Sequence, residues 1–339
     1  MKWLAFNRWP LVGRFRNRYV RRVLGLLVLT VMVCLVWFFT NRALSPLNAV
    51  RIETVRVDGA EAGSFDGTLR VVTFNIAHGR GLTGSNWQLG RKEAQLSRLD
   101  QIAALLRDAN ADIVVLNEVD FDAVWTSGVN QARYIARKAG FPFLAEQRNF
   151  DMAIPFFSLR WGNAILSKRP IANAQCVNFA AHATWERIVA GHKKGLLCEI
   201  ELGDGSVTRV LGVHLDTRSE STRLPAAKQI ENIRAESKTP LILAGDMNSG
   251  PLGFPDVRPT SDGRTCMSYL LATGAYRTDP LSEPGPDDYT FPSSNPTRTI
   301  DWILVTREWK ITSRTVLNRQ LSDHNAVLME IQFESAEQR

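Results

Sequence analysis

From residue 69 onward the chain alternates apolar runs with short polar stretches, a pattern typical of a mixed α/β domain. Eight runs have the length of strands and are apolar almost throughout, as expected for strands covered on both faces. They span residues 69–76, 112–116, 162–167, 195–202, 209–215, 241–244, 301–305 and 326–333. Apolar positions at helical spacing predict helices at residues 92–107 and 225–236 and a shorter one at 132–139.

An uncharged apolar run at residues 23–40, VLGLLVLTVMVCLVWFFT, precedes this domain. As a helix it would rise about 27 Å, close to the roughly 30 Å hydrocarbon core of a bilayer. The arginine-rich side of such a span stays in the cytoplasm. The pattern therefore predicts a basic cytoplasmic segment at 1–22, a transmembrane helix at 23–40, a tether at 41–68 and an extracytoplasmic domain at 69–335, facing the periplasm in a bacterium.

A cleaved signal peptide is the alternative to this anchor. Ala43-Leu44-Ser45 has the small residues of a cleavage site, but Pro46 would follow the cut and disfavours it. The apolar stretch is also longer than a signal peptide needs. We expect an uncleaved anchor.

The formal charge of +7 belongs to the N-terminus. Residues 1–42 contain eight Lys and Arg and no acid, so the rest of the chain has 33 basic residues of the 41, against 34 acidic ones. A near-neutral domain argues against tight, non-specific binding of nucleic acid, which depends on many contacts from Lys and Arg to phosphates.

Cysteine usage leaves two interpretations open. Cys176 and Cys198 lie on two runs that neighbouring strands would bring together, so they could pair in an oxidising compartment. The alternative is that Cys176, Cys198 and Cys266 are unpaired thiols, and the sequence does not favour the disulfide over it.

Polar residues that follow apolar runs supply the candidate chemistry. Glu118 ends the run before it, and a carboxylate at a strand end is a suitable oxygen ligand for Mg²⁺. Asn75, at the end of another run, could add a carbonyl contact or orient that carboxylate. Either residue alone would more simply be a surface Glu or a turn-forming Asn.

Asp246 and Asn248 follow a third apolar run and are two residues apart. Gly245 permits a sharp turn before them, and this spacing can aim both side chains the same way. A carboxylate can deprotonate a water while a carboxamide donates a hydrogen bond to a developing oxyanion. An Asx turn, which uses the same residue types, is the structural alternative.

Asp301 and His324 suggest an orienting pair, in which the carboxylate fixes the imidazole tautomer and favours the imidazolium. The other ring nitrogen could then donate to a phosphoryl oxygen. His214 could play a similar part. A lone histidine is more often structural, but His214 and His324 both end or precede apolar runs and stand close to an aspartate, Asp216 and Asp323.

Other reaction classes lack their motifs. The sequence has no Gly-x-Ser-x-Gly elbow, no glycine-rich nucleotide loop before a helix, and no Cys–His arrangement of a nucleophile and its base. Attack by water, assisted by a divalent metal, is the chemistry that remains.

In order along the chain, these clusters resemble the endonuclease/exonuclease/phosphatase (deoxyribonuclease I-like) superfamily, over about residues 69–333. The motifs that carry the resemblance are Thr73-Phe74-Asn75-Ile76, Leu116-Asn117-Glu118, Gly162-Asn163-Ala164-Ile165-Leu166-Ser167, Gly245-Asp246-Met247-Asn248, Tyr289-Thr290-Phe291-Pro292, Arg298-Thr299-Ile300-Asp301 and Ser322-Asp323-His324. The resemblance implies a four-layer α/β sandwich, two packed mixed β-sheets flanked by helices.

The resemblance also implies a role for each candidate. Asn75, Glu118 and Asp323 match metal-site positions, so Mg²⁺ is the expected cofactor, with Mn²⁺ as a possibility. Catalytic positions are matched by His214, Asp246, Asn248, Asp301 and His324. Asn117 departs from the commoner Gln before the metal-site glutamate, and the family leaves open whether Asp246 or the His–Asp pair is the general base.

The predicted function is a membrane-tethered phosphodiesterase. The anchor and the near-neutral domain favour lipid headgroups as substrate, nucleic acid is the alternative, and no protein partner is predicted. A catalytically inactive, anchored scaffold that binds through the loop at residues 180–194 or the tether is the non-enzymatic alternative, which the complete set of clusters disfavours.

Overall fold

The computed structural model describes residues 11–44, 49–57, 64–82, 92–154, 157–179 and 193–334. Most of the loop at 180–194, with His182 and His192, lies outside the described residues. The chain divides into two compact units. The smaller unit comprises residues 1–45 and 152–157, and the larger one comprises residues 46–151 and 158–339.

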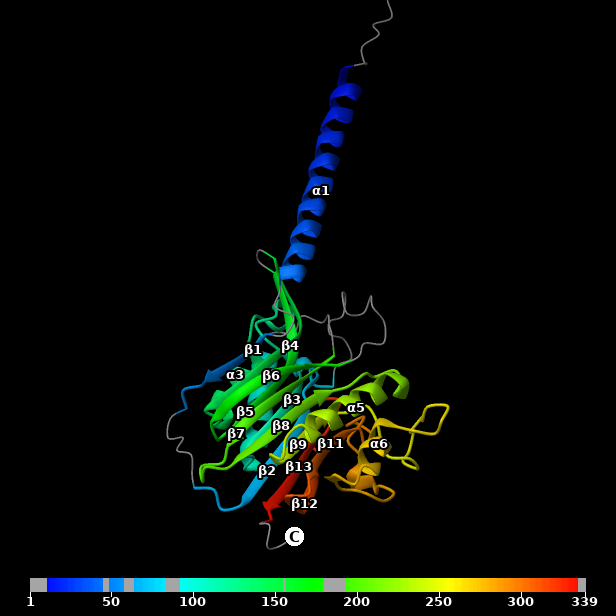
Figure 1. Cartoon of the computed structure of the whole chain (residues 1–339). Helices are drawn as coiled ribbons and strands as arrows, with labels where there is room; N and C mark the ends of the chain where they lie inside the picture. The colour runs from blue at the N-terminus through cyan, green and yellow to red at the C-terminus, as the bar shows by residue number, and fades with distance from the viewer. Residues whose placement is uncertain are drawn as a thin grey trace, which may run out of the picture. The chain divides into compact units, whose positions relative to one another are not determined.

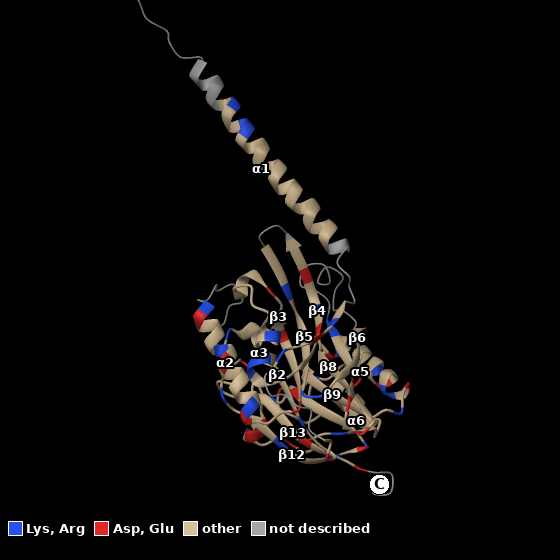
Figure 2. Cartoon of the chain, turned by 90° about the vertical axis from the view of Figure 1, so that its left-hand side faces the viewer, with Lys and Arg blue, Asp and Glu red and all other residues tan. Residues whose placement is uncertain are grey.

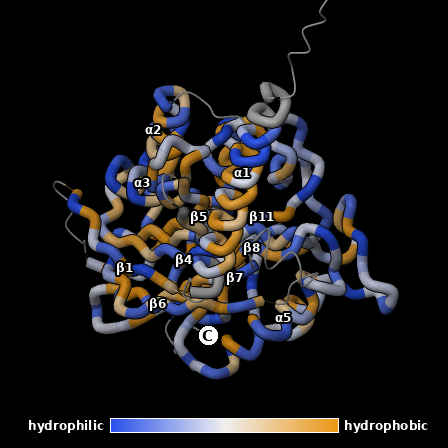
Figure 3. The backbone as a smooth tube through the Cα atoms, turned by 90° about the horizontal axis from the view of Figure 1, so that it is seen from above, coloured by the Kyte–Doolittle hydropathy of each residue, from blue (hydrophilic) through white to orange (hydrophobic). Residues whose placement is uncertain are grey.

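Helix α1 (Leu11–Leu44) is the main element of the smaller unit. Its stretch Asn17–Asn41 has a mean hydropathy of 2.6 and is long and apolar enough to cross a membrane. Figure 2 shows basic residues near the start of α1 and none along its apolar stretch, and the tube in Figure 3 changes from blue to orange accordingly. By length and composition, α1 is a candidate span, a property that signal sequences share.

The larger unit contains two β-sheets (Figure 1). The first has seven strands in the order β1-β4-β5-β3-β2-β13-β12. These are β1 (Val50–Thr54), β2 (Thr68–Asn75), β3 (Ile113–Asp120), β4 (Phe143–Ile154), β5 (Phe157–Ser167), β12 (Trp309–Leu317) and β13 (Ala326–Phe333). The second sheet has six, in the order β10-β11-β9-β8-β7-β6. These are β6 (Ile171–Asn178), β7 (Lys194–Glu201), β8 (Val207–His214), β9 (Leu241–Asp246), β10 (Tyr276–Arg277) and β11 (Asp301–Thr306).

Helices cover the outer face of each sheet. Among its described residues, the α-helices of this unit are α2 (Lys92–Asp108), α3 (Gln131–Ala139), α5 (Glu220–Ala235) and α6 (Cys266–Ala272). Short 3₁₀ turns are η1 (Ala77–Gly79), η2 (Val124–Thr126) and η3 (Pro286–Asp288). Local sequence sets the limits of α3, since the Asn130 side chain accepts from the Arg133 amide at its start and Gly140 takes a φ of 87° at its end.

Three hydrophobic cores separate these layers. Helices α2 and α3 pack on the first sheet in one core, and α5 and α6 pack on the second sheet in another. The third core lies between the sheets and contains Val115, Ile165 and Ile242. Two mixed sheets flanked by helices confirm the expected four-layer α/β sandwich.

Alternation within single strands explains their apolar sequences. In β9, Leu241 and Leu243 face the helices, whereas Ile242 and Ala244 face the other sheet. Successive side chains point to opposite faces, and both faces of this strand are covered, so the four positions from Leu241 to Ala244 are all apolar.

Strand direction brings the ends of six segments to one edge. β2 and β3 are parallel, and so are β8 and β9. β11 is antiparallel to β9, with Asp301 opposite Asp246, and β13 is antiparallel to β2. The ends of β2, β3, β8 and β9 and the beginnings of β11 and β13 therefore lie at the same edge.

Some elements differ from the expectation. The alternation of apolar and polar residues at 50–57 predicts a short strand within the expected tether, and β1 confirms it, but this strand pairs with β4 and so belongs to the first sheet. Helix α5 begins at Glu220, earlier than the expected 225, and Pro225 lies inside it. Strand β12 alternates exposed and half-buried residues at the sheet edge and has no apolar run to signal it. Of the two interpretations of the cysteines, unpaired thiols are confirmed, since Cys176 and Cys198 lie on neighbouring strands but are free, with Cys198 opposite Ala174.

Candidate active site

Seven of the eight residues singled out from the sequence are linked to one another at this edge of the two sheets, and Asp323 is the exception. Asn75 and Glu118 come from the first sheet, and His214 and Asp246 come from the second. The Asn75 amide nitrogen lies 3.3 Å from Glu118 Oε1, 3.1 Å from Asp246 Oδ2 and 3.5 Å from His324 Nε2. One carboxamide thus links groups from both sheets.

His324 and Asp301 form a buried pair. His324 Nδ1 lies 3.1 Å from Asp301 Oδ1 and 2.9 Å from Asp301 Oδ2, and Asp301 is 0% exposed. Burial alone would lower the pKa of His324, but the carboxylates of Asp301 and Asp246 outweigh it and raise the pKa to about 10. The ring is an imidazolium at neutral pH, with Nε2 turned toward Asp246 Oδ2 at 3.8 Å.

The carboxyl group of Asp246 has a pKa close to the neutral pH range. Burial raises its pKa to about 6, although His324 opposes the shift. The backbone holds it in place, since its amide donates to Asn117 Oδ1 at 2.9 Å and the Asn248 amide donates to Asp246 Oδ1 at 3.0 Å. Gly245 is required before it, because a Cβ there would lie 1.8 Å from the Val213 carbonyl oxygen. A carboxylate with this pKa can accept a proton from water near neutral pH.

Glu118 has the opposite electrostatic character. Burial would raise its pKa, but the positive charge of His78, together with those of Lys193 and His324, outweighs it and lowers the pKa to about 2. Its backbone takes a φ of 52° at a register shift between β3 and β5. Such an irregularity re-aims a side chain out of the strand's alternation.

The surroundings of Glu118 fit a cation. Its nearest recorded partners in the described part of the chain are Asn75 at 3.3 Å, His78 at 3.5 Å and His214 at 3.9 Å. These distances are long for charge-assisted hydrogen bonds, so an ionised carboxylate keeps capacity for a ligand. The Glu118 carboxylate supplies the kind of oxygen donor that Mg²⁺ prefers. The Asn75 oxygen accepts from the Ala77 amide at 3.0 Å while its amide nitrogen faces Glu118, so Asn75 orients the carboxylate.

A second group of potential metal ligands lies beside Asn75 and Glu118. One ligand atom each from Asp246, Asp301 and His324 lies within 4.8 Å of the others. Both oxygens of Asp301 already face the protonated Nδ1 of His324, and that positive ring repels a cation. Glu118, beside the Asn75 carboxamide, therefore remains the better metal position.

His214 differs from His324. Burial lowers its pKa well below the usual value, and the nearby Lys193 lowers it further. Lys193 Nζ lies 2.9 Å from His214 Nε2, so the neutral ring accepts a hydrogen bond from the ammonium. Asp246 Oδ2 is 3.6 Å from the same nitrogen. The positive charge at this position is carried by Lys193 rather than by the imidazole.

Asn248 and Asp323 are the two candidates least tied to the cluster. The Asn248 side chain donates to the Leu215 carbonyl at 3.3 Å, and its φ is 50°. Asp323 pairs with Arg80 at 3.3 Å and with the Ser322 hydroxyl at 3.1 Å, and its side chain is 37% exposed. No described contact joins Asp323 to Glu118 or Asn75. Its role as a metal ligand remains a prediction.

Sequence reasoning missed His78, Asp120 and Lys193. His78 Nδ1 lies 2.7 Å from Asp120 Oδ1, and its Nε2 faces Glu118. Burial opposes ionisation of His78, but the Asp120 carboxylate outweighs it and raises the pKa. The position of Asp120 two residues after Glu118 could have indicated that it belongs to the site. The position of His78 three residues after Asn75 gave no such indication.

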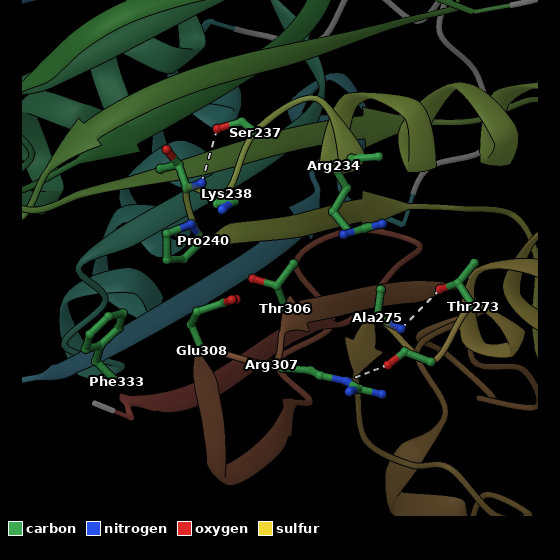
Figure 4. A pocket seen from close by; sticks show the side chains of 13 residues that line it. Arg234, Ser237, Lys238, Pro240, Thr273, Ala275, Thr306, Arg307, Glu308 and Phe333 are labelled. Atoms are coloured by element: carbon green, nitrogen blue, oxygen red, sulfur yellow. Dashed lines mark hydrogen bonds between the residues drawn. The ribbon is translucent and has the colours of Figure 1, made fainter. Parts of the chain in front are cut away.

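One cavity of the protein lies away from this cluster of polar residues. Its volume is about 730 Å³, and Figure 4 shows Arg234, Lys238 and Arg307 in its lining. It adjoins the start of β9 and the end of β11, the strand ends opposite to Asp246 and Asp301. None of the catalytic candidates lines it, so convergence of polar groups, and not cavity size, identifies the site.

Comparisons with known proteins agree with the fold. The profile of the Endonuclease/Exonuclease/phosphatase family matches residues 72–324. An endonuclease/exonuclease/phosphatase structure from Beutenbergia cavernae is similar at a TM-score of 0.61 and 19% identity, over 79% of this chain and 72% of that one. No curated protein sequence matches.

Two structures of known enzymes are similar as well. The mannosyl-6-phosphatase of Bacteroides thetaiotaomicron has a TM-score of 0.56 at 16% identity, covering 78% of this chain and 100% of that one. The human Nocturnin catalytic domain, with bound sulfate, has a TM-score of 0.54 at 17% identity, covering 84% and 97%. At these identities the likeness shows the fold.

Fold and site together define a metal-dependent phosphoric ester hydrolase. The chain belongs to the Endonuclease/Exonuclease/phosphatase family, whose profile covers most of its length and every catalytic candidate.

Proposed function

We propose that this protein is a membrane-tethered, Mg²⁺-dependent phosphodiesterase that hydrolyses lipid headgroups by attack of water. The observation that carries the proposal is the contact of the Asn75 carboxamide with Glu118, Asp246 and His324. This contact brings together the ionised carboxylate of Glu118, the carboxylate of Asp246 with its pKa of about 6, and the imidazolium of His324.

Glu118 would hold the metal, with Asp323 as a further predicted ligand. Asn75 would be a ligand only with its carbonyl oxygen turned from the Ala77 amide to the metal, and otherwise orients Glu118. When bound, Mg²⁺ supplies positive charge against the phosphoryl oxygens. Asp246 Oδ2 takes the proton of the attacking water, whose oxygen forms the new bond to phosphorus. His324 Nε2 donates to a phosphoryl oxygen, and Asp301 keeps its ring oriented and charged. Asn248 turns its amide toward the phosphate. The bond to the leaving oxygen breaks, and that oxygen takes a proton from solvent, giving an alcohol and a phosphomonoester.

The lipid preference rests on two features. The apolar stretch of α1 has the length of a membrane span, which would hold the domain beside a bilayer. Its arginine-rich start would lie in the cytoplasm and the catalytic domain on the other side. The near-neutral domain lacks the excess of basic residues that tight nucleic-acid binding uses.

The test uses the full chain in detergent micelles with Mg²⁺ or a chelator. Phospholipid vesicles, single-stranded DNA and duplex DNA serve as substrates beside bis(p-nitrophenyl) phosphate. Glu118→Gln, Asp246→Asn and His324→Gln remove the three functions, and Asp262→Asn, an exposed residue of another loop, is the matched control. We expect metal-dependent hydrolysis of lipid that only the control retains.

Three results would contradict the proposal. Rapid cleavage of DNA with inert lipids would assign the chain to the nucleases of this family. Hydrolysis that persists with a chelator would contradict a metal-dependent reaction. Hydrolysis that persists in Asp246→Asn would contradict the role of Asp246 as the proton acceptor.

A further inference from the structure

A basic cavity adjoins the candidate active site. Its volume is about 360 Å³, and Asn248 lies in its wall. The charged residues that line it are the four arginines Arg218, Arg223, Arg258 and Arg298 and the two acids Glu220 and Asp256. The lining has an excess of two positive charges in a domain whose overall charge is close to zero.

The two acids already count in this excess, because Glu220 pairs with Arg223 at 3.0 Å and Asp256 lies near Arg298. Glu220 is committed to the protein, since it accepts from the Ser249 hydroxyl at 2.6 Å and from the Cys266 amide at 2.7 Å. Asp256 is largely exposed, and its oxygen is 4.0 Å from Arg298 Nε. An exposed pair at this distance is weak and is screened by salt.

Arg223 gives the cavity a fixed, buried wall. It is 7% exposed, its Nη1 donates to the Asp216 carbonyl at 2.7 Å, and its Nη2 donates to Glu220 at 3.0 Å. Its Nε is buried without a hydrogen-bond partner among the described residues. A buried guanidinium donor left unpaired is costly, and an anion in the cavity would be a suitable acceptor.

Two side chains connect the cavity with the phosphate-facing groups. Asn248 belongs to both. The Arg298 guanidinium stands 4.8 Å from the centroid of the Phe291 ring, which in turn lies 4.7 Å from the His324 ring. A substrate with its scissile phosphate at His324 would therefore have its neighbouring group beside the arginines.

We infer that this cavity binds a second phosphate group of the substrate, next to the phosphodiester that is cleaved. The inference rests on the proposed function and narrows it to substrates with an additional phosphate. Arginine fits this role because its planar fork of donors matches phosphate oxygens and stays charged at every relevant pH. The second phosphate could belong to a phosphorylated lipid headgroup or to a nucleotide.

The experiment compares substrates that differ by one phosphate, using the full chain in detergent with Mg²⁺. One pair is thymidine 5′-(p-nitrophenyl phosphate) with and without a 3′-phosphate. The other is vesicles of phosphatidylinositol and of phosphatidylinositol 4-phosphate. The measured quantity is the ratio of kcat/KM within each pair, and the pair that shows a preference identifies the source of the phosphate.

We expect wild type to prefer the additional phosphate in one pair by about tenfold or more, as for a charge-assisted contact. Arg258→Gln and Arg298→Gln should each reduce that ratio by about tenfold, with Arg258→Lys intermediate. Arg258 is exposed, so its replacement should leave the melting temperature unchanged. Arg307→Gln, in the cavity of Figure 4, is the matched control and should leave the ratio unchanged.

A wild-type ratio close to one in both pairs, with hydrolysis of both members, would overturn the inference and leave the proposed function intact. An equal loss in Arg307→Gln would overturn it too, because the effect would then be one of general charge. Failure to hydrolyse any of the four substrates would remove the proposed function and the inference together.

Discussion

His324 Nδ1 lies 2.9 Å from Asp301 Oδ2, and both residues are buried. The two residues come from different sheets, since Asp301 begins β11 and His324 precedes β13. The pair therefore sets the charge of the imidazole and also fixes one sheet against the other.

Asp301→Asn should reduce kcat/KM by about 100-fold or more, because the imidazolium then loses its main electrostatic partner. It should also change how stability depends on pH. The pKa of His324 is about 10 in the folded chain and 6.5 without its surroundings, so the folded state holds an additional proton between these values. This stabilisation is complete below pH 6.5 and is lost as the pH rises toward 10.

Urea unfolding of wild type and Asp301→Asn across this range measures the effect. The difference between their unfolding free energies should shrink with rising pH. A difference that stays constant from pH 6 to pH 10 would contradict the assignment of the pair.

Glu118→Gln should abolish Mg²⁺ binding and reduce hydrolysis by at least about 100-fold, since a neutral amide replaces the charged ligand. The pKa of Glu118 is about 2, so the carboxylate stays ionised across the working range and metal affinity should not fall as the pH drops from 8 to 5 through this group. Calorimetric titration with Mg²⁺ checks both statements. Wild-type affinity in the variant would place the metal elsewhere.

His78→Gln tests a positioning residue. His78 faces Glu118 through Nε2 and is held by Asp120 through Nδ1, so its loss should change the orientation of the metal carboxylate. We expect about tenfold weaker Mg²⁺ affinity, with much of kcat recovered at saturating metal. A loss of kcat that no Mg²⁺ concentration restores would instead place His78 in contact with the substrate.

Glu146→Gln should stabilise the protein. Glu146 is 1% exposed, accepts from Asn130 at 2.6 Å through Oε1, and its Oε2 has no partner among the described residues. Burial raises its pKa above 4.5. The folded state then holds a proton that the unfolded chain releases, so stability falls as the pH rises above 4.5.

The amide carries no such penalty, so the unfolding free energy should rise by about 1 kcal/mol at pH 8 and by less at pH 5. Thermal melting at both pH values measures this. Greater destabilisation at pH 8 than at pH 5 would contradict the argument.

A chain that lacks residues 1–45 tests the anchor. The larger unit begins at Pro46, so its core stays whole. We expect the full chain to sediment with membranes after alkaline washing and the shortened chain to stay in the supernatant with its hydrolysis of bis(p-nitrophenyl) phosphate retained. An immunoblot that finds the natural protein without residues 1–45 and soluble would favour the signal-peptide alternative.

Sequence patterns predict this fold well where strands are buried on both faces. Strand β9 lies between two cores, and its apolar run announces it. Strand β12 packs at an edge with mixed burial, and β4 contains several polar residues, so neither has a run to detect. The site was predictable as far as polar residues end such runs, as for Asn75 and Asp246. His78 and Lys193 could not be found this way, because only the packing of distant segments brings them to Glu118 and His214.

The side chain of Asn117 reaches in two directions. It accepts from the Asp246 amide in the second sheet and donates to Asn163 in its own. Glu118 and Asp246 consequently belong to separate halves of the fold that meet only after both sheets have formed and docked. During refolding, secondary structure would return before hydrolytic activity, and the appearance of product would time the docking of the sheets.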